Sequence, residues 1–519
     1  MGGDKYVESV KWKRELHKKK GTVCIETTSA MLENGDVFKY LRESLDKHGV
    51  LKNAKPPPYR YILKQLCEQH TKDIYALMKS FLSHWKSGDW EKDVLRERLE
   101  KEFSGFARAR AAIFLEAMFL LREFYDAKLQ DNNEVDFDDM LNNATRALHS
   151  GEIKNPYKLI LADEFQDISR ARARMIQAML KQNMEFKLFA VGDDWQAIYR
   201  FAGADIFIMT SFREEFGETA QNVLSQTFRS NQGIADIASQ FVSRNQSQIK
   251  KDVIASNSFC VGVVNVLRYQ YDEHVRPLIE SKLREVAGFA NAREPISVFI
   301  LGRYNIKFYD RLLPNKIIYQ WEKDFTGKLK IKYKTMHGAK GLEADYVFVL
   351  GMNAGKFGFP NELEDDPILR LVMPQKENFE FAEERRLFYV ALTRAKQKVY
   401  LLARQDRPSS FIEEIVQNDR TGAVIDELAD DRGNTTFTPK CRDCDGFLLE
   451  REGPHSIFYG CSNWKPDNLG CDYKEDVICP KCEVGTLKAR KGHWGLFYSC
   501  SEYPQCEYKR NPKNKTASY

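Results

Sequence analysis

The sequence predicts an α/β protein built on parallel strands, followed by two small metal-binding modules. The apolar segments 159–162 and 188–191 have the length of buried strands, and each leads into acidic residues. Buried parallel strands appear as short apolar runs, and ligands of open α/β sheets lie at their carboxyl ends. Eight of the eleven cysteines occur after residue 440, which predicts the metal-binding part. At 519 residues the chain is long enough for three or more domains.

The amino-terminal part is predicted to be helical. Residues 1–150 are rich in helix-forming sequence, interrupted at Pro56-Pro-Pro58, and the amphipathic stretch 108–129 predicts one long helix. Its many lysines and arginines are typical of solvated helical faces. The net charge of the chain is +5, which is too small to argue for nucleic-acid binding by itself.

Two adjacent carboxylates end the first predicted strand. The run from Leu159 to Ala162 places Asp163 and Glu164 directly at its carboxyl end. In a phosphoryl-transfer site the first carboxylate can hold Mg²⁺, and its neighbour can orient or deprotonate the attacking water. An isolated Asp-Glu pair is more often a strand capped by surface acids. The motif after the second strand favours the catalytic interpretation.

The second predicted strand leads into the turn Gly192-Asp-Asp-Trp-Gln196. We expect Gln196 to lie close to the first site, where its amide can donate to a phosphate or to the attacking water. Tyr199, Arg200 and Phe201 follow and supply a hydroxyl, a cation and a ring, the set that holds single-stranded nucleic acid by stacking and phosphate contact. Taken singly, each ring is more often a core residue than a base platform.

A turn with glycines precedes another apolar strand at 346–351. His337 and Gly341 belong to this turn, where glycine permits close backbone approach to a ligand. Glu343 can accept a hydrogen bond from a ribose hydroxyl, and Lys340 can contact phosphate. Considered alone, Lys340 would be interpreted as a solvated lysine.

A helix is predicted over the segment that contains Arg394. Leu387, Val390, Ala391 and Arg394 recur at helical spacing, so a helix buried on its apolar stripe presents Arg394 from a fixed position. A rigidly held guanidinium can neutralise the charge that develops on a γ-phosphate. The charged run at 383–386 is by itself typical of a solvated helical face.

Taken together, these segments resemble the superfamily 1 DNA helicases of the UvrD and Rep type, most of all the helicase IV branch of that family. The resemblance covers residues 11–404, and the motifs follow the family's order. Residues 135–141 resemble the acidic-aromatic segment upstream of motif II, 159–167 motif II, 189–205 motif III, 226–230 motif IV, 335–349 motif V and 383–396 motif VI.

The resemblance implies two RecA-like P-loop NTPase lobes that use ATP and Mg²⁺ to move 3′ to 5′ on single-stranded or partly duplex DNA. It implies that Arg394 is the arginine finger, that Arg229 reaches the nucleotide phosphates and that Gln196 couples nucleotide to DNA. It also implies nucleotide contacts for Gln166, Gly341 and Glu343. The DNA contacts implied are Tyr199, Arg200, Phe201, His337 and Lys340.

One element of that family is missing from the sequence. No Gly-x-x-x-x-Gly-Lys-[Ser/Thr] occurs, since Gly327-Lys328 precedes Leu329 and Gly355-Lys356 precedes Phe357. We therefore expect the first lobe to be incomplete. The alternatives are a gene fragment, one half of a split enzyme whose second chain supplies the loop, and a variant without hydrolysis. The competing function is a non-hydrolysing DNA-binding subunit.

The carboxy-terminal cysteines fall into two sets of four. Phe458-Tyr-Gly-Cys461 recurs as Phe497-Tyr-Ser-Cys500, which indicates a tandem duplication. Four thiolates suit a tetrahedral zinc ion. Since no secretory leader or membrane span is apparent, we expect a reducing cytoplasm, where disulfides are the weaker alternative. The predicted ligands of two Zn²⁺ ions are Cys441, Cys444, Cys461, Cys471, Cys479, Cys482, Cys500 and Cys506.

These sets resemble the zinc ribbons at the end of type IA topoisomerases. No strand-cleaving domain accompanies them, so topoisomerase activity is disfavoured. After Cys479, basic residues alternate with rings such as Tyr503 and Tyr508, a composition that suits single-stranded DNA. The alternative is that the rings form a miniature core.

The predicted domain boundaries follow from these assignments. The interval between motifs IV and V is short, so the large insertion of UvrD and Rep is expected to be reduced. Residues 1–150 are assigned to the helical part of the first motor lobe and its insertion, 151–225 to the rest of that lobe, 226–405 to the second lobe, 406–438 to a linker, and 439–475 and 476–512 to the two zinc ribbons.

Overall fold

The structure, a computed structural model, divides into two compact units that we describe separately. Unit 1 comprises Met1–Asp193, Tyr199–Thr219 and Glu364–Lys376, and unit 2 comprises Asp194–Ile198, Ala220–Leu363 and Glu377–Tyr519. The residues described are 4–28, 30–31, 34, 36–51, 59–183, 185–290, 294–437, 441, 443–444, 448–461, 464, 470–479, 481–482, 484–492 and 495–510.

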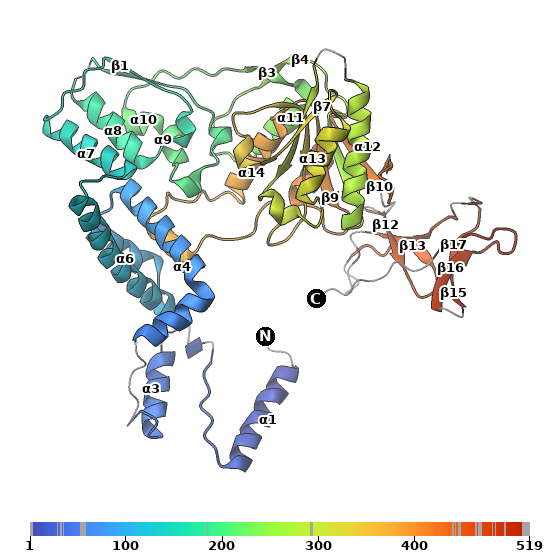
Figure 1. Cartoon of the computed structure of the whole chain (residues 1–519), viewed down its shortest axis with the longest axis horizontal. Helices are drawn as coiled ribbons and strands as arrows, with labels where there is room; N and C mark the ends of the chain where they lie inside the picture. The colour runs from blue at the N-terminus through green and yellow to red at the C-terminus, as the bar shows by residue number, and fades with distance from the viewer. Residues whose placement is uncertain are drawn as a thin grey trace. The chain divides into compact units, whose positions relative to one another are not determined.

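The first part of unit 1 is helical, as predicted (Figure 1). The long helix expected at 108–129 is α6, which spans Gly105–Asp131. The buried core of this helical part includes Phe81, Trp85, Leu115 and Leu371. Leu371 comes from the segment 364–376, which contributes to the core through the 3-10 helix η7 (Pro367–Leu371). The other helices are α1 (Asp4–Lys20), α3 (Val37–Lys47), α4 (Tyr59–Gly88), α5 (Lys92–Glu102) and α7 (Phe137–Ser150).

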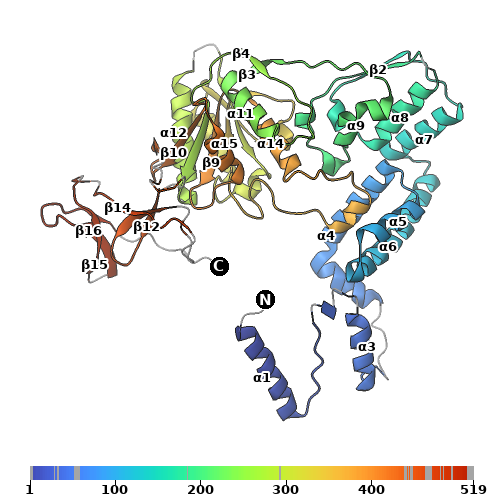
Figure 2. The ribbon, with the colours of Figure 1, turned by 180° about the vertical axis from the view of Figure 1, so that it is seen from behind.

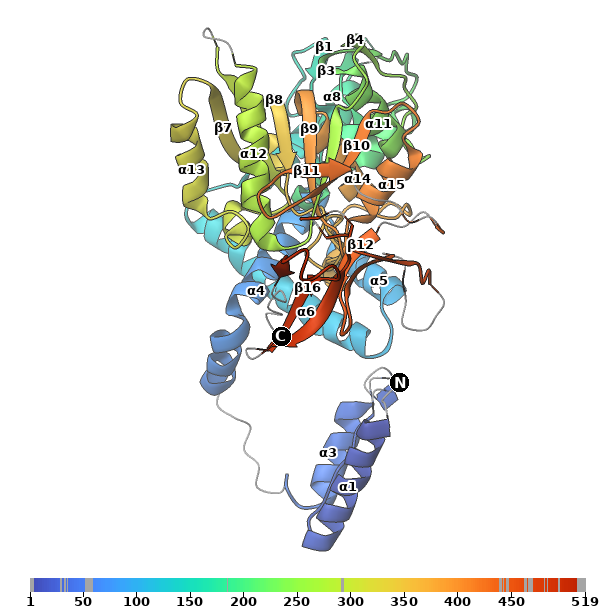
Figure 3. The ribbon, with the colours of Figure 1, turned by 90° about the vertical axis from the view of Figure 1, so that its right-hand side faces the viewer.

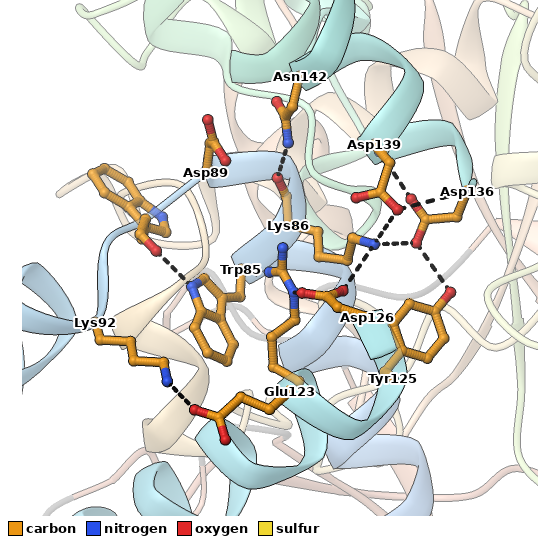
Figure 4. Close-up of polar contacts among 12 residues, drawn as sticks. Trp85, Lys86, Asp89, Lys92, Glu123, Tyr125, Asp126, Asp136, Asp139 and Asn142 are labelled. Atoms are coloured by element: carbon orange, nitrogen blue, oxygen red, sulfur yellow. Dashed lines mark hydrogen bonds and ion pairs between the residues drawn. The ribbon is translucent and has the colours of Figure 1, made fainter. Parts of the chain in front are cut away.

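A buried lysine joins three of these helices, α4, α6 and α7 (Figure 4). The side chain of Lys86, near the end of α4, is 2% exposed, and its Nζ lies 2.6 Å from Asp136 and 2.8 Å from Asp139, which form the capping box of α7. Asp126 of α6 lies 3.7 Å from the same nitrogen. The backbone carbonyl of Lys86 accepts from Asn142 of α7. Arg174 of α8 (Arg170–Lys181) donates to the carbonyls of residues 87 and 88.

The sheet of unit 1 has two parallel strands in the described part of the chain. β1 (Leu159–Ala162) pairs with β2 (Lys187–Ala190). One face packs against α8, α9 (Ile206–Thr210) and α10 (Phe212–Phe216). The other face is exposed, because Leu159, Leu161 and Phe189 retain 55%, 70% and 61% of their accessible surface. Both predicted strands are confirmed.

Unit 2 is built on a seven-stranded sheet of order β11-β10-β5-β9-β8-β6-β7, parallel except for β11. The α/β class with a parallel sheet is therefore confirmed. The strands are β5 (Val264–Tyr269), β6 (Ile296–Gly302), β7 (Leu329–Thr335), β8 (Ala344–Val349), β9 (Ala395–Arg404), β10 (Val424–Ala429) and β11 (Thr435–Phe437).

Helices cover both faces of this sheet (Figures 2 and 3). α12 (Val275–Gly288) and α13 (Asn315–Asp324) pack on one face, where Leu283 and Trp321 enter the main core. α11 (Gln232–Val242), α14 (Ala382–Leu392) and α15 (Ser410–Asn418) lie on the other, where the Phe241 ring meets those of Phe388 and Phe411 edge to face. β3 (Gln226–Asn231) and β4 (Ile254–Asn257) form a separate parallel pair.

The segment 406–438, predicted to be a linker, is largely part of this fold. It contains α15, β10 and β11, and β10 pairs in parallel with β5. The Asp and Gly residues that suggested a linker lie in tight turns: Asp419 accepts from the backbone of Thr421 and Val424, and Asp430 from that of Arg432 and Asn434.

The two carboxy-terminal modules pack against each other. The first has strands β12 (Leu448–Glu452), β13 (Ile457–Cys461) and β14 (Lys474–Asp476), and the second has β15 (Leu487–Gly492), β16 (Gly495–Cys500) and β17 (Lys509–Arg510). The repeated Phe-Tyr-x-Cys sequences occupy the equivalent strands β13 and β16. Ile457 of the first module shares a buried cluster with Leu487 and Tyr498 of the second.

Candidate functional site

The acidic pair of unit 1 lies on an exposed turn at the carboxyl end of β1. Asp163 and Glu164 are both exposed, and Asp163 Oδ1 accepts from the backbone N–H of Glu164 at 2.9 Å. Glu164 has φ +50°, a left-handed conformation that costs energy for a non-glycine residue and that the surrounding contacts must hold. Two carboxylates that face solvent in this way are available to a cation.

Gln166 connects the ends of the two strands. Its side chain is fully buried, its Nε2 donates to Glu164 Oε2 at 2.5 Å, and its Oε1 accepts from the N–H of Asp193 at 2.9 Å. A Cβ on Gly192 would lie 2.6 Å from Gln166 Oε1, so a larger residue would force the Gln166 amide to move. Gln166 therefore fixes the Glu164 carboxylate.

Tyr199, Arg200 and Phe201 also belong to unit 1. The Tyr199 and Phe201 rings meet edge to face at 6.0 Å, and Phe201 is 54% exposed. Arg200 forms an ion pair with Asp365 at 2.5 Å. Burial raises the pKa of Tyr199, and the charges of Asp167 and Glu164 raise it further. Phe201 thus offers an exposed ring with a cation next to it in sequence.

Within unit 2, Gln196 of the segment 189–205 is hydrogen-bonded to one residue of the segment 335–349 and to one of the segment 383–396. Arg394 Nη2 donates to the Gln196 side-chain oxygen at 3.3 Å, and Lys340 Nζ donates to the Gln196 carbonyl at 2.8 Å. Arg394 is 1% exposed and also donates to the carbonyls of Val390 and Leu342. The predicted helix is α14 (Ala382–Leu392), but it ends before Arg394, which lies in the turn that leads into β9 and is held there by these hydrogen bonds.

Arg386 is a residue whose role the sequence did not suggest. The run 383–386 was expected to be solvated, yet Arg386 is 2% exposed, donates to the Ala197 carbonyl at 2.6 Å and pairs with Glu377 at 2.6 Å. The expectation was wrong because α14 is buried on nearly all sides. The spacing of Arg386, Val390 and Arg394 by four residues could have indicated that both arginines share a face.

A second polar group in unit 2 contains Arg229 and Glu343. Glu343 accepts from Arg229 of β3 at 3.0 Å and pairs with Lys396 at 2.8 Å. These hydrogen bonds, from Lys396 first and then Arg229, lower the pKa of Glu343. Gly341 precedes this group with φ +76°, a conformation that favours glycine. Arg229, predicted to contact the nucleotide phosphates, and Glu343, predicted to contact the ribose, therefore lie in one cluster.

His337 lies in the 3-10 turn after β7. Burial lowers the pKa of its imidazole to about 4, with a smaller contribution from the Arg303 charge. His337 is therefore neutral at pH 7 and can act as a hydrogen-bonding or stacking group but not as a cation.

The structure thus places the predicted residues in two sets. Asp163, Glu164, Gln166, Tyr199, Arg200 and Phe201 lie in unit 1, and Gln196, Arg229, His337, Lys340, Gly341, Glu343 and Arg394 lie in unit 2.

The eight carboxy-terminal cysteines form two sites with the donor set of zinc. The four Sγ atoms of each site lie within 4.8 Å of one another. Cys444 and Cys461 are 3.3 Å apart, and Cys482 and Cys500 are 3.5 Å apart. Tetrahedral zinc with Zn–S bonds of about 2.3 Å requires sulfurs about 3.8 Å apart, so both sites fit the ion closely. Backbone N–H groups of Gly485 and Val484 lower the pKa of the Cys482 thiol to about 6.

Three family models match successive parts of the chain. Residues 17–217 match the UvrD/REP helicase N-terminal domain, and residues 315–406 match the UvrD-like helicase C-terminal domain. Residues 438–474 and 476–515 each match the topoisomerase DNA binding C4 zinc finger. In the part of the chain that the structure describes, no helix is long and apolar enough to cross a membrane.

Several curated proteins are similar to this chain over part of their length. DNA helicase IV of Escherichia coli is 38% identical over 299 residues, which are 58% of this chain and 41% of that protein. ATP-dependent DNA helicase Rep of Buchnera aphidicola is 20% identical over 49% of this chain and 36% of its own length. A probable DNA helicase of Mycoplasma pneumoniae is 26% identical over 60% and 56%. The matched region is thus only about half, or less, of each of these relatives.

Proposed function

Because the chain belongs to the UvrD/Rep family of helicases and carries topoisomerase-type zinc ribbons, we propose that it works as an ATP-dependent DNA helicase with 3′-to-5′ polarity in DNA repair or recombination. The substrate proposed is single-stranded or partly duplex DNA, and the compartment is the cytoplasm, where zinc-binding thiolates stay reduced.

Each site residue has a role that its surroundings support. Asp163 holds Mg²⁺, and Glu164, fixed by Gln166, orients or deprotonates the attacking water. Arg229 and Arg394 neutralise the negative charge that develops on the phosphates. Gly341 lets the backbone approach the nucleotide, and Glu343 accepts from its ribose. Tyr199, Arg200, Phe201, His337 and Lys340 contact DNA.

The observation that carries the proposal is the pair of contacts at Gln196. Its side chain accepts from Arg394, and its carbonyl accepts from Lys340. A group assigned to the nucleotide and a group assigned to DNA are therefore attached to one residue. If Arg394 moves when it binds a phosphate, Gln196 would transmit that movement to Lys340. A helicase needs such a connection to couple ATP hydrolysis to movement along DNA.

The experiment must allow for the phosphate loop, which does not occur in these 519 residues. Without backbone amides and a lysine around the phosphates, we expect negligible DNA-stimulated ATP hydrolysis by this polypeptide. We expect hydrolysis and unwinding of a 3′-tailed duplex when the phosphate-loop segment of a UvrD/Rep relative is fused ahead of residue 1, and loss of both in the fusion with Glu164→Gln.

Two results would contradict this reasoning. Hydrolysis by the unfused polypeptide that Glu164→Gln abolishes would mean that a different phosphate site exists. A folded fusion that binds DNA but neither hydrolyses ATP nor unwinds would favour the second candidate, a non-hydrolysing DNA-binding subunit. A partner chain that supplies the loop is the corresponding proposal for a split enzyme.

A further inference from the structure

The segment Asp194–Ile198 is a short piece of chain that is held inside unit 2. The chain leaves unit 1 after Asp193 and returns to it at Tyr199. Apart from Gln196, each residue of the segment is at most 5% exposed. Gln196 carries the two hydrogen bonds that support the proposed coupling. Any contact that fixes this segment therefore also fixes Gln196.

The entry residue of the segment, Asp194, is held by an ion pair with Lys251. Lys251 Nζ lies 2.9 Å from Asp194 Oδ1, and the two side chains are 13% and 0% exposed. The other carboxylate oxygen accepts from the backbone N–H of Ile249 at 2.8 Å, and the Asp194 carbonyl accepts from the Gln248 side chain at 3.4 Å. A carboxylate buried this completely needs a cation, because burying an unpaired charge is strongly unfavourable.

The same ammonium group also contacts the next residue of the segment. Lys251 Nζ lies 4.3 Å from the centre of the Trp195 ring, an attractive arrangement of a cation over an indole. The Trp195 ring meets the Tyr389 ring of α14 edge to face at 5.4 Å. Further along the segment, Arg386 donates to the carbonyl of Ala197. The segment is therefore fixed at two separate points.

The residue just before the segment, Asp193, is held by a contact within unit 1. Its N–H donates to Gln166, whose amide donates to Glu164. Two adjacent residues of the chain are therefore fixed in different ways, Asp193 through Gln166 and Asp194 through Lys251. If Asp194 were free to move, the turn that follows it would lose its fixed position in unit 2.

We propose that Lys251 is a positioning residue for the ATP-driven reaction proposed above. By pairing with Asp194 it keeps Gln196 within hydrogen-bond reach of its partners in unit 2. Lys251 has no contact of its own with nucleotide or DNA in this mechanism. The inference rests on the proposed function and adds to it a residue outside the six segments that carry the family resemblance.

The catalytic test uses the whole chain with the phosphate-loop segment fused ahead of residue 1, as above. Lys251→Met removes the cation and is expected to lower kcat of DNA-stimulated hydrolysis about tenfold to a hundredfold, the effect of a displaced group. KM for ATP is expected to change less than about threefold. Lys251→Arg keeps a cation and should recover most of kcat. Lys250→Met, at the exposed neighbouring lysine, is the matched control and should change kcat less than about twofold.

The decisive comparison combines two variants. If Lys251 acts through Gln196, the loss of kcat in Lys251→Met with Gln196→Ala should be no larger than the larger of the two single losses, because residues that act as a unit are not additive. A purely structural role would multiply the two losses. Lys251→Met should also cost less when Asp194→Asn has already removed the carboxylate that needs the cation.

The positioning itself is measured by hydrogen exchange on the unfused chain. Peptides that cover Asp194–Ile198 should open on the order of a hundredfold more often in Lys251→Met, because the buried carboxylate is left unpaired. Lys251→Arg and Lys250→Met should exchange like wild type.

Unchanged exchange in Lys251→Met, or a loss of kcat that multiplies with that of Gln196→Ala, would refute the positioning role and leave the helicase proposal intact. If the wild-type fusion does not hydrolyse ATP while Lys251→Met still opens the segment, the proposed function fails. The positioning role then fails with it, and the ion pair only stabilises the fold.

Discussion

Replacing Lys86 by Met removes the positive charge that lies 2.6 Å from Asp136 and 2.8 Å from Asp139. Met fills a similar volume, so the change isolates the charge. Asp136 would lose a hydrogen bond, keep those from Tyr125 and from the Asp139 backbone, and face Asp139 without a cation between them. The cation over the Tyr125 ring, at 4.8 Å, would be lost as well.

The magnitude follows from burial. Removing one partner of a buried ion pair costs roughly 3–5 kcal/mol, and an exposed pair contributes about 0–1 kcal/mol. Lys86 is 2% exposed, but Asp136 and Asp139 keep 26% and 21% exposure, so water screens part of the loss. We expect a loss of about 3 kcal/mol, the lower end of the buried range.

The loss should also depend on pH. Burial raises the pKa of Asp136, but hydrogen bonds from Lys86 and from the Asp139 backbone outweigh it, so the pKa is lowered overall. A carboxyl with a lowered folded pKa stabilises the fold above its unfolded value of about 3.9 and loses that contribution as pH falls through its folded pKa. The deficit of Lys86→Met should therefore be largest near neutral pH and shrink in acid.

Because a chain with several domains does not unfold in two states, the assay should be local. Hydrogen exchange of peptides from α4, α6 and α7 measures the opening free energy at this joint. Lys92→Met, which removes an exposed pair with Glu123 nearby, is the control and should cost less than about 1 kcal/mol. If Lys86→Met costs no more than Lys92→Met, the buried cluster does not hold these helices together.

The two metal sites, the zinc ribbons and the β1–β2 turn can each be tested separately. Protein purified without added zinc should contain two zinc ions per chain, and metal analysis that finds one or none would contradict the two four-thiolate sites. Removing the residues after Phe437, which leaves β11 intact, should weaken binding to long single strands more than to short ones, and the lost part should be salt-sensitive; unchanged affinity for long strands would reassign the zinc ribbons to protein contact. Gly192→Ala should destabilise the β1–β2 turn by about 1–3 kcal/mol in hydrogen exchange, because the new Cβ would lie 2.6 Å from Gln166 Oε1, whereas Gly288→Ala, with open space around it, should be tolerated.

The parts that the sequence predicted are those whose pattern is local. β1, β2 and β8 are short apolar runs, and α6 is a long amphipathic stretch, so the periodicity alone identifies them. The cysteine spacing predicted both metal sites, because four thiolates leave few alternatives. Helix α14 followed from helical spacing, which is also local, although it ends at Leu392 and Arg394 lies in the turn after it.

The parts that the sequence did not predict depend on distant contacts. Lys86 is an ordinary surface residue by type, and its carboxylates lie 50 and 53 residues away. Arg386 looked solvated because its partners, Ala197 and Glu377, are not neighbours in sequence. The segment 424–429 was predicted to be part of a linker because its carboxylates interrupt the apolar pattern of a strand. In the structure the carboxylate of Asp426 pairs with the buried Arg268, which allows this charged residue to lie within a strand.

The contact between the two zinc ribbons makes their metal content a shared property. Tyr498 of the second donates to the Gly453 carbonyl of the first, and Ile457, Leu487 and Tyr498 are buried together. Metal binding supplies most of the folding free energy of such small modules, so a ribbon that loses its ion is expected to unfold. Its unfolding would expose the shared buried cluster and so destabilise the other ribbon. Occupancy should therefore be cooperative, so that scarce zinc yields chains with both ions or neither, and the ribbon pair responds to zinc supply more like a switch than a graded sensor.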